Sequence, residues 1–521
     1  MVMATILSKT QTFENPLDEP IQNAKRADPC ILVIFGATGD LTARKLVPAL
    51  YNMAREGQLP ANFACVGFAR RDKSHDDFRG EMLEGINKYS RVKPVDEDIW
   101  KEFSQCLFYH RANFKDDDGY ESLGSFLKQL DQEFGTRGNR VYYLSTQPTF
   151  FTEISEKLHE HNLIYPAEET KKWSRVIIEK PFGRDLESAI QLQNDVENCM
   201  DESQIYRIDH YLGKETVQNL MVFRFSNSIF EDLWNNHHID HVQMTVAEDI
   251  GIGTRGKLWE ESGSLRDIVQ NHMMQVLSLA TMEPPNSFES KAIHDEKVKV
   301  LEAIRTIPQD KFYDHVVRGQ YAPGYIEGEK VNGYREEDNV DSNSDVETYA
   351  ALKLYIDNWR WAGVPFYLRT GKHLPKKVTD ISVVFKQAPG ALFDEAVARH
   401  QPNVLSIRIQ PDEGISLKMN CKVPGLTTPL QPVKMDFRYG EYFGLEPPEA
   451  YERLITDCMA GDRTLFARWD EVKASWNLLS PVLDQWREEK PKDFPNYQAG
   501  SWGPEEADRL IESDGRKWCL L

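Results

Sequence analysis

Paired cysteine motifs are missing from this chain of 521 residues. Its seven cysteines are odd in number and scattered, and no two form a C-x-x-C pair, so the sequence indicates neither a disulfide framework nor a zinc knuckle. H-E-x-x-H and similar ligand spacings are also missing, and we expect no metal. Cysteine usage of this kind is typical of a reduced compartment, so we expect a cytoplasmic protein.

Long apolar runs are missing as well. No stretch approaches the ~18 consecutive apolar residues that a transmembrane helix needs. The first twenty residues carry Asp and Glu and contain no apolar core long enough for a signal peptide. We therefore expect no membrane partner.

The chain has fewer basic than acidic residues. Lys and Arg number 62 against 82 Asp and Glu, which gives a formal net charge of −20. The overall field of such a protein repels nucleic acid and anionic lipid, and we expect no nucleic-acid partner. Any anionic ligand must therefore be held by a locally basic pocket. With 40% hydrophobic residues, the chain is long enough for a globular protein of roughly two to four domains.

The first part of the chain alternates strand and helix patterns. Residues 1–27 show no periodicity and are expected to form a flexible tail. Residues 28–206 then predict a doubly wound α/β domain of the Rossmann type, because short apolar runs alternate with helical patterns. The expected strands are Cys30–Phe35, Phe63–Ala69, Arg140–Leu144 and Arg175–Glu179, with helical segments after Leu41 and over 150–163.

After about residue 206 the apolar residues alternate with period two. This pattern is typical of half-exposed antiparallel strands. Residues 207–521 therefore predict one α+β domain on a large, mostly antiparallel sheet. The alternating segments are His241–Glu248, Val378–Phe385, Val404–Ile409, Ile415–Met419 and Val433–Phe437.

A glycine-containing segment joins the first strand to the first helix. It consists of Gly36, Ala37, Thr38, Gly39, Asp40 and Leu41. Glycine lets the backbone approach a pyrophosphate, and the free N–H groups at a helix start can bind it. The segment lacks full G-x-G-x-x-G spacing, so a plain strand-to-helix turn is the alternative.

Two arginines follow the second strand, where an NAD enzyme would place an acidic residue for the ribose hydroxyl. Arg70 and Arg71 suit a 2′-phosphate, whereas Asp72 competes with that interpretation. A solvated charge cluster at a strand end is the third interpretation.

Two charged segments each allow a functional and a structural interpretation. Arg207–Lys214 reads Arg-Ile-Asp-His-Tyr-Leu-Gly-Lys, a composition suited to an anion but also to an exposed turn. In the second segment, Ser264 and Asp267 form the pattern of a capping box, and helical spacing places His272 on an apolar face. A lone histidine on such a face is more often a core residue than a functional one.

Two lysine-containing segments follow strands. Glu179-Lys180-Pro181-Phe182-Gly183 lies at a strand end, where open α/β sheets bind ligands, although an ordinary strand terminator is the alternative. Arg369 to Lys377 follows a strand that is expected to end in a glycine turn. This cationic group indicates either an anion site or a solubilising loop.

Taken together, RIDHYLGK, R-D-x-x-Q-N-H, G-x-x-G-D-L and E-K-P-F-G resemble the glucose-6-phosphate dehydrogenase family, from about residue 30 to about 515. The resemblance implies oxidation of glucose 6-phosphate at C1 to 6-phosphogluconolactone with NADP, the first oxidative step of the pentose phosphate pathway. It also implies a homodimer or a dimer of dimers.

The same resemblance implies roles for single residues. His272 would be the catalytic base, and Asp209 would hold its other ring nitrogen. The segment Gly36–Leu41 would bind the cofactor with Arg70 and Arg71, and Lys180 would lie between cofactor and sugar. The substrate would be bound through its phosphate by His210, Tyr211, Lys214, Lys372 and Lys377, and through sugar hydroxyls by Glu248 and Asp267.

One departure from the family concerns a second, structural NADP site of its animal members. Val378 and Ser382 occupy two of the positions that are basic there, so we do not predict that site. Two other functions stay open on the sequence: a sugar dehydrogenase of the glucose-fructose oxidoreductase type, and a non-catalytic NADP-binding redox sensor.

Overall fold

The computed structural model describes residues 27–388, 401–426, 430–444 and 448–521. The tail expected over residues 1–27 lies outside the described residues except for Ala27. None of the helices within the described ranges is long and apolar enough to cross a membrane.

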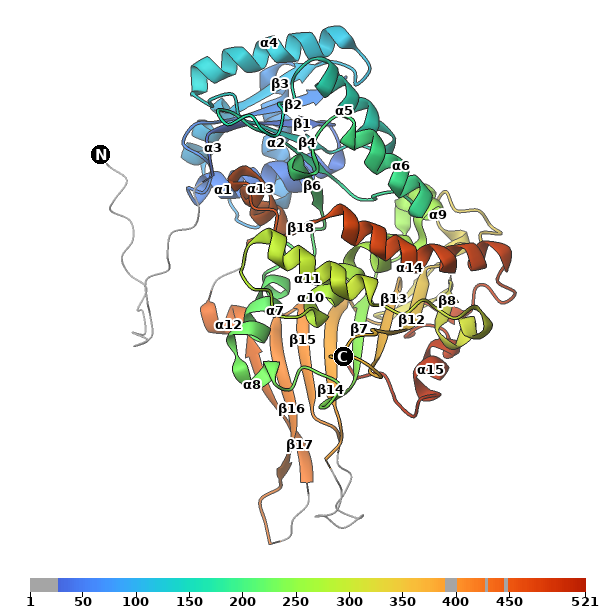
Figure 1. Ribbon diagram of the computed structural model, residues 1–521. Coiled ribbons are helices and arrows are strands. Elements are labelled where there is room, and N and C mark those ends of the chain that lie inside the picture. Colours follow the sequence, from blue (N-terminus) through green and yellow to red (C-terminus); the bar gives the residue numbers. More distant parts are fainter. Residues whose placement is uncertain (1–26, 389–400, 427–429, 445–447) are drawn as a thin grey trace.

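The first sheet has seven strands in the order β18-β6-β5-β4-β1-β2-β3 (Figure 1). All neighbours pair in parallel except β18, which is antiparallel to β6. Six of these strands have the Rossmann order, so the predicted fold class is confirmed. The strands are β1 (Cys30–Phe35), β2 (Phe63–Ala69), β3 (Leu107–Arg111), β4 (Arg140–Leu144), β5 (Ser174–Ile178), β6 (Ile205–Ile208) and β18 (Phe466–Ala467).

Helices lie on both sides of this sheet, with α1, α2 and α3 in one contacting group and α4, α5 and α6 in another (Figure 1). The continuous apolar sequence of β1 matches its position between two helical layers, where all six of its residues are buried. The helices are α1 (Val47–Arg55), α2 (His75–Tyr89), α3 (Glu97–Gln105), α4 (Asp117–Phe134), α5 (Phe151–Glu160) and α6 (Leu186–Glu197), with a π-helical turn η1 (Thr42–Leu46) before α1.

The second sheet has eight strands in the order β17-β16-β15-β14-β7-β13-β12-β8. Only β7 and β13 pair in parallel, so the sheet is mostly antiparallel, as predicted. The strand expected to end after Leu368 continues to Gly371. The strands are β7 (Ile239–Ala247), β8 (Val316–Gly319), β12 (Tyr349–Tyr355), β13 (Pro365–Gly371), β14 (Val378–Phe385), β15 (Val404–Gln410), β16 (Gly414–Lys422) and β17 (Leu430–Arg438).

The helices of the second part include two that run directly into one another, η5 and α10. Short two-stranded sheets pair β10 (Gly324–Ile326) with β11 (Glu329–Val331), and β9 (Tyr321–Ala322) with β19 (Tyr497–Gln498). The helices are α7 (Glu215–Ser226), α8 (Ser228–Glu231), α9 (Gly256–Ser264), the π-helix η5 (Leu265–Met273), α10 (Met274–Thr281), α11 (Ser290–Glu302), α12 (Tyr439–Phe443), α13 (Ala450–Ala460), α14 (Trp469–Glu488) and α15 (Glu505–Glu512).

The prediction that the alternating strands are half-exposed is wrong for β7 and β14. Nearly every residue of these two central strands is buried. The C-terminal segment covers the second face: Gln243 donates a hydrogen bond to the Lys517 carbonyl, and the Cys519 N–H donates one to the Gln243 side chain, each at 2.8 Å. Strand β15, farther toward the edge, does alternate between buried and partly buried residues.

The chain does not divide cleanly at residue 206. Strand β6 spans that position, and β18 returns from the C-terminal part to pair with β6 in the first sheet. Just before β18, helix α13 contacts α1. The division into domains at 28–206 and 207–521 stays a prediction. Residues 450–467 fall in the second of these ranges but pack against elements of the first.

Candidate active site

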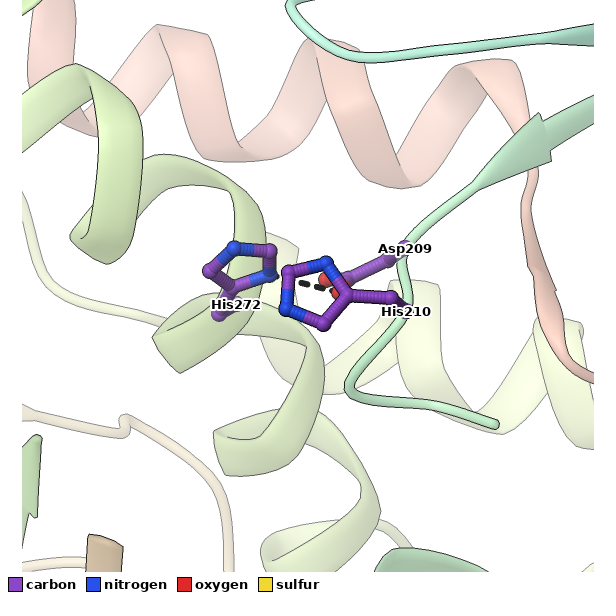
Figure 2. A group of neighbouring side chains, drawn as sticks. All are labelled: Asp209, His210 and His272. Atoms are coloured by element: carbon purple, nitrogen blue, oxygen red, sulfur yellow. Dashed lines mark hydrogen bonds and ion pairs between the residues drawn. The ribbon is translucent and has the colours of Figure 1, made fainter. Parts of the chain in front are cut away.

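Two segments that are far apart in the sequence form the site. Asp209 and His210 directly follow β6 and lead towards α7, whereas His272 lies near the end of η5 (Figure 2). Asp209 and His272 are 63 residues apart in sequence, and the fold brings their side chains into contact.

The contact is a hydrogen bond of 2.5 Å between His272 Nδ1 and Asp209 Oδ1 (Figure 2). Both side chains are buried. The Tyr211 ring stacks on the imidazole with centroids 4.3 Å apart, and the His210 ring meets it edge-on at 4.6 Å. Packing on two sides fixes the orientation of the His272 ring.

The charges around the pair set which form of each group is stable. Burial lowers the pKa of His272 and the Lys180 ammonium lowers it further, whereas Asp209 opposes the shift. Burial would raise the pKa of Asp209, but the charge and hydrogen bond of His272 outweigh it and lower that pKa to about 2. The pair therefore favours a neutral imidazole beside an ionised carboxylate.

Lys180 lies at the other ring nitrogen. Its Nζ is 2.9 Å from His272 Nε2 and 2.9 Å from Asp267 Oδ1. An ammonium has only donors, so Nε2 accepts and the ring proton lies on Nδ1, towards Asp209. The predicted residues Asp209, Lys180, Asp267 and His272 thus form one contiguous cluster, in which Nε2 is the unprotonated ring nitrogen.

The capping box predicted for Ser264 and Asp267 is wrong. Ser264 has helical backbone angles and makes no side-chain cap. The Leu265 N–H donates instead to the Glu347 carboxylate at 3.0 Å, and the carboxylate of Asp267 pairs with Lys180. Glu347 was not identified from the sequence, where no local pattern connects it with a helix that begins 82 residues earlier.

Three lysines predicted to bind a phosphate lie at the same end of the second sheet. Lys214 precedes α7, with its Nζ 2.5 Å from Gln410 Oε1, and burial lowers its pKa to about 8. Lys377 is exposed, and its charge contributes to the lowered pKa of Lys214. Lys372 is buried, pairs with Glu248 and lies over the Trp259 ring at 4.8 Å.

Not all cations of the segment from Arg369 to Lys377 face the site. Arg369 is buried between the rings of Trp502 and Trp518, at 4.8 and 4.2 Å from their centroids. Lys376 donates to the carbonyl of Leu521. The segment is therefore no solubilising loop, because only Lys376 and Lys377 of its lysines and arginines are exposed.

The segment Gly36–Leu41 follows β1, and its helix begins at Asp40. Gly36 has φ +83°, and a Cβ there would lie 2.2 Å from the Ser145 carbonyl oxygen. No side chain fits at this position, because the turn packs against the Ser145 backbone directly after β4. The turn lies at the carboxyl end of β1, where a helix begins. This arrangement suits a dinucleotide pyrophosphate.

Arg70 and Arg71 follow β2 at the same edge of the sheet. Both are exposed, and within the described part of the chain neither guanidinium forms a hydrogen bond or an ion pair. The competing Asp72 pairs with Arg111, with Asp72 Oδ1 and Arg111 Nη1 at 3.0 Å.

One correction concerns the strand before Lys180. It is β5, the fifth strand in chain order and not the fourth, because β3 was not predicted. Glu179 was named only as part of the segment Glu179–Gly183, and its interaction with Tyr451 of α13 was not foreseen.

Comparisons with known proteins cover almost the whole chain. Residues 33–219 match the family model "Glucose-6-phosphate dehydrogenase, NAD binding domain", and residues 221–519 match "Glucose-6-phosphate dehydrogenase, C-terminal domain". The chain is 56% identical over 505 residues to the glucose-6-phosphate 1-dehydrogenase of Chlamydia pneumoniae, covering 96% of this chain and 98% of the relative. It is 44% identical over 488 residues to that of Bacillus subtilis strain 168, covering 94% and 98%.

Solved structures agree with these relatives. A glucose-6-phosphate dehydrogenase in complex with its substrate glucose 6-phosphate superimposes with a TM-score of 0.86 at 35% identity, covering 96% of this chain and all of the other. Glucose-6-phosphate 1-dehydrogenase from Mycobacterium avium superimposes with a TM-score of 0.81, also at 35% identity, covering 96% and 99%.

Proposed function

The chain belongs to the glucose-6-phosphate dehydrogenase family, and on that premise we propose that it oxidises C1 of glucose 6-phosphate to the lactone with NADP. The observation that carries the proposal is the buried pair of His272 and Asp209, with Lys180 at the remaining ring nitrogen. The family matches support neither a sugar dehydrogenase of the glucose-fructose oxidoreductase type nor a redox sensor.

Oxidation at C1 requires removal of the hydroxyl proton as hydride leaves the carbon, and a bound nicotinamide nucleotide supplies the hydride acceptor. His272 takes the proton at Nε2, since Nδ1 already carries its hydrogen towards Asp209. Asp209 holds that tautomer and stabilises the imidazolium as it forms. When sugar binds, the Lys180 ammonium donates to the reacting oxygen in place of Nε2, while it keeps its hydrogen bond to Asp267.

The phosphate of the substrate binds to the cations around the RIDHYLGK loop. Lys214 contributes a cation from the loop, where His210 and Tyr211 supply neutral hydrogen-bonding groups, and Lys372 and Lys377 contribute cations from beyond β13. A protein with a net charge of −20 needs such a local group of cations to hold a dianion. When the Lys372 ammonium turns to the phosphate, the carboxylate of Glu248 becomes free to accept a hydrogen bond from a sugar hydroxyl.

NADP is the proposed cofactor because, among the residues that the structure describes, the two guanidinium groups after β2 have no partner while their acidic neighbour is paired. Arg70 and Arg71 offer planar guanidinium groups that bind a 2′-phosphate bidentately. The carboxylate of Asp72, which would accept a ribose hydroxyl of NAD, is held by Arg111. The segment Gly36–Leu41 binds the pyrophosphate through its backbone.

A second copy of this chain is the proposed partner, in a homodimer or a dimer of dimers. The apolar residues Val433, Met435 and Phe437 alternate along β17, and Phe437 contacts Tyr442 and Phe443 of α12. We call this set the β17 face. A long, exposed apolar edge strand is a surface that proteins normally cover.

Absorbance at 340 nm tests the proposed function. With NADP and glucose 6-phosphate the purified protein should reduce the nucleotide, whereas unphosphorylated glucose should give little reduction at the same concentration. Equal rates with both sugars would favour the glucose-fructose oxidoreductase type, and no reduction with either, despite NADP binding, would favour a sensor.

A further inference from the structure

Two side chains from different helices hold the segment that follows Lys180. The Trp476 indole of α14 donates a hydrogen bond from Nε1 to the carbonyl of Phe182 at 2.9 Å. Arg266 of η5 donates from Nε to the carbonyl of Arg184 at 2.8 Å. Neither donor takes part in the proposed reaction, although Arg266 belongs to the R-D-x-x-Q-N-H motif. Both hydrogen bonds therefore act on the backbone just beyond Lys180.

The backbone between these carbonyls and Lys180 has little freedom. Strand β5 ends at Ile178, so Lys180 lies beyond the hydrogen bonds of the sheet. The ring of Pro181 fixes the φ angle of the next residue. Gly183 has φ +78°, and a Cβ there would lie 2.6 Å from the backbone nitrogen of Ala189 in α6. A displacement of the segment after Pro181 would therefore be passed on to Lys180.

Helix α14 is also connected to the helix that carries His272. It contacts α6 of the first part of the chain and α11 and η5 of the second (Figure 1). The buried carboxylate of Glu471 in α14 accepts a hydrogen bond from Lys297 of α11 at 2.8 Å, and Lys297 also donates to Gln275 of α10 at 2.6 Å. Because α10 continues directly from η5, α14 gives Lys180 and His272 a common support.

We infer that Trp476 and Arg266 are positioning residues for the ammonium of Lys180. They hold residues 182–184 so that this ammonium lies beside His272 Nε2. The inference rests on the proposed function. The ammonium is 2.9 Å from Nε2, and misplacement of a catalytic group by about 1 Å can lower a rate by about 100-fold. The two hydrogen bonds should therefore affect the reaction although neither donor touches the substrate.

The inference has a pH signature at His272. The Lys180 ammonium lowers the pKa of His272, so its displacement should raise that pKa. The base must be neutral, and activity is lost as the pH falls through this pKa, so the acid limb of the kcat/KM profile should move to higher pH. Other titratable groups around His272 are Asp209, His210 and Tyr211 after β6, Asp267 of η5, and Asp380 of β14, which lines a small cavity with His272.

Removal of each donor tests the inference. Trp476→Phe and Arg266→Met should each lower kcat by about 3- to 30-fold, while KM for glucose 6-phosphate changes little because the phosphate-binding cations stay in place. Both variants should also move the acid limb to higher pH. Arg266 is only partly buried, so Arg266→Met keeps the test valid if Trp476→Phe fails to fold.

Matched controls remove equivalent hydrogen bonds at other places. Trp361 is a buried tryptophan whose Nε1 donates to the Thr281 carbonyl at 2.8 Å. Arg335 is a partly buried arginine whose Nε donates to the Ser344 carbonyl at 3.0 Å. Trp361→Phe and Arg335→Met should keep the wild-type acid limb even where they lower stability.

Lys180→Met separates positioning from general damage. The limb shift arises from the displaced ammonium, so in the Lys180→Met background neither Trp476→Phe nor Arg266→Met should shift the limb further. The inference is overturned if either variant keeps the wild-type limb in the native background, if a control shifts it equally, or if a further shift remains without Lys180. Wild-type protein that fails to reduce NADP with glucose 6-phosphate would overturn the proposed function instead.

Discussion

At the scale of single residues, His272 has an anion at one ring nitrogen and a cation at the other. The carboxylate of Asp209 favours the charged imidazolium, whereas burial and the Lys180 ammonium favour the neutral ring. The net lowering of the pKa keeps the imidazole neutral near pH 7, which is the form a general base needs. Neither neighbour alone would produce a base that is both neutral and correctly oriented.

Replacement of His272 by Asn should lower kcat by about 10²- to 10⁴-fold, with the KM for sugar little changed. Asp209→Asn should affect the same step, so the double variant should be hardly worse than His272→Asn alone. Steady-state kinetics of the three variants measure this. Losses that multiply in the double variant would show that the two residues act independently.

The dependence of kcat/KM on pH should report the titration of His272 beside Asp209. Because the pKa of His272 is lowered from its usual value, the acid limb of the wild type should have its midpoint below about 6.5. Asp209 raises the pKa of His272, so Asp209→Asn should move the limb to still lower pH while reducing the plateau. A limb that moves to higher pH in this variant would contradict the assignment of His272 as the base.

Arg70 is the residue proposed to bind the 2′-phosphate of NADP. Arg70→Ala should weaken NADP binding by roughly 10- to 100-fold, the effect of a charged hydrogen bond, and leave NAD binding nearly unchanged. Titration of wild type and variant with both nucleotides measures the difference. An equal loss for NADP and NAD would show that Arg70 supports the fold.

At the scale of elements, the beginning of η5 depends on a residue from another part of the chain. Gly263 breaks the preceding helix with φ +68°, and the Leu265 N–H is then satisfied by Glu347. Because η5 carries both Asp267 and His272, its first turn sets the geometry of the site.

Glu347→Ala should leave the buried Leu265 N–H unpaired and lower the free energy of unfolding by about 1–3 kcal/mol. Ser264→Ala is the control, since the Ser264 side chain caps nothing and should cost much less. Urea unfolding of both variants gives the comparison. If Ser264→Ala lowers the free energy of unfolding as much as Glu347→Ala, the Ser264 side chain does cap this helix, as the sequence suggested.

The sequence predicted the elements whose apolar pattern is local and strong. Strands β1, β2 and β4 were foreseen with their bounds, because a run of buried apolar residues ends at a turn signal. In the first sheet, strands β3, β6 and β18 were missed: β3 is only partly buried, β6 has four residues, and β18 has two residues and exists through its pairing with β6. No local pattern encodes a contact of this kind.

The site was predictable to the extent that its residues lie in motifs. Asp209 and His272 were paired by resemblance, and the fold brings them to 2.5 Å. The capping by Glu347 could not be foreseen, since it depends on a tertiary approach across 82 residues. The same holds for the burial of β7, which results from coverage by the C-terminal segment.

At the scale of the whole molecule, the β17 face should decide the oligomeric state. Met435→Asp places a charge in the proposed interface and should shift the protein towards the 60.1 kDa mass of the single chain in sedimentation equilibrium. Tyr325→Asp, at a similarly exposed residue of β10, is the control and should leave the mass unchanged. A wild type that sediments as a single chain would contradict the proposed dimer.

The pairing of β18 with β6 also bears on the order in which the molecule can be made. During synthesis, β6 leaves the ribosome about 260 residues before β18, which at typical elongation rates is a delay of roughly 10 to 50 s. For that time the first sheet has an unpaired edge beside the unfinished active-site loop, and such an edge can pair with another chain. The nascent protein should therefore depend most on chaperones between the synthesis of these two strands.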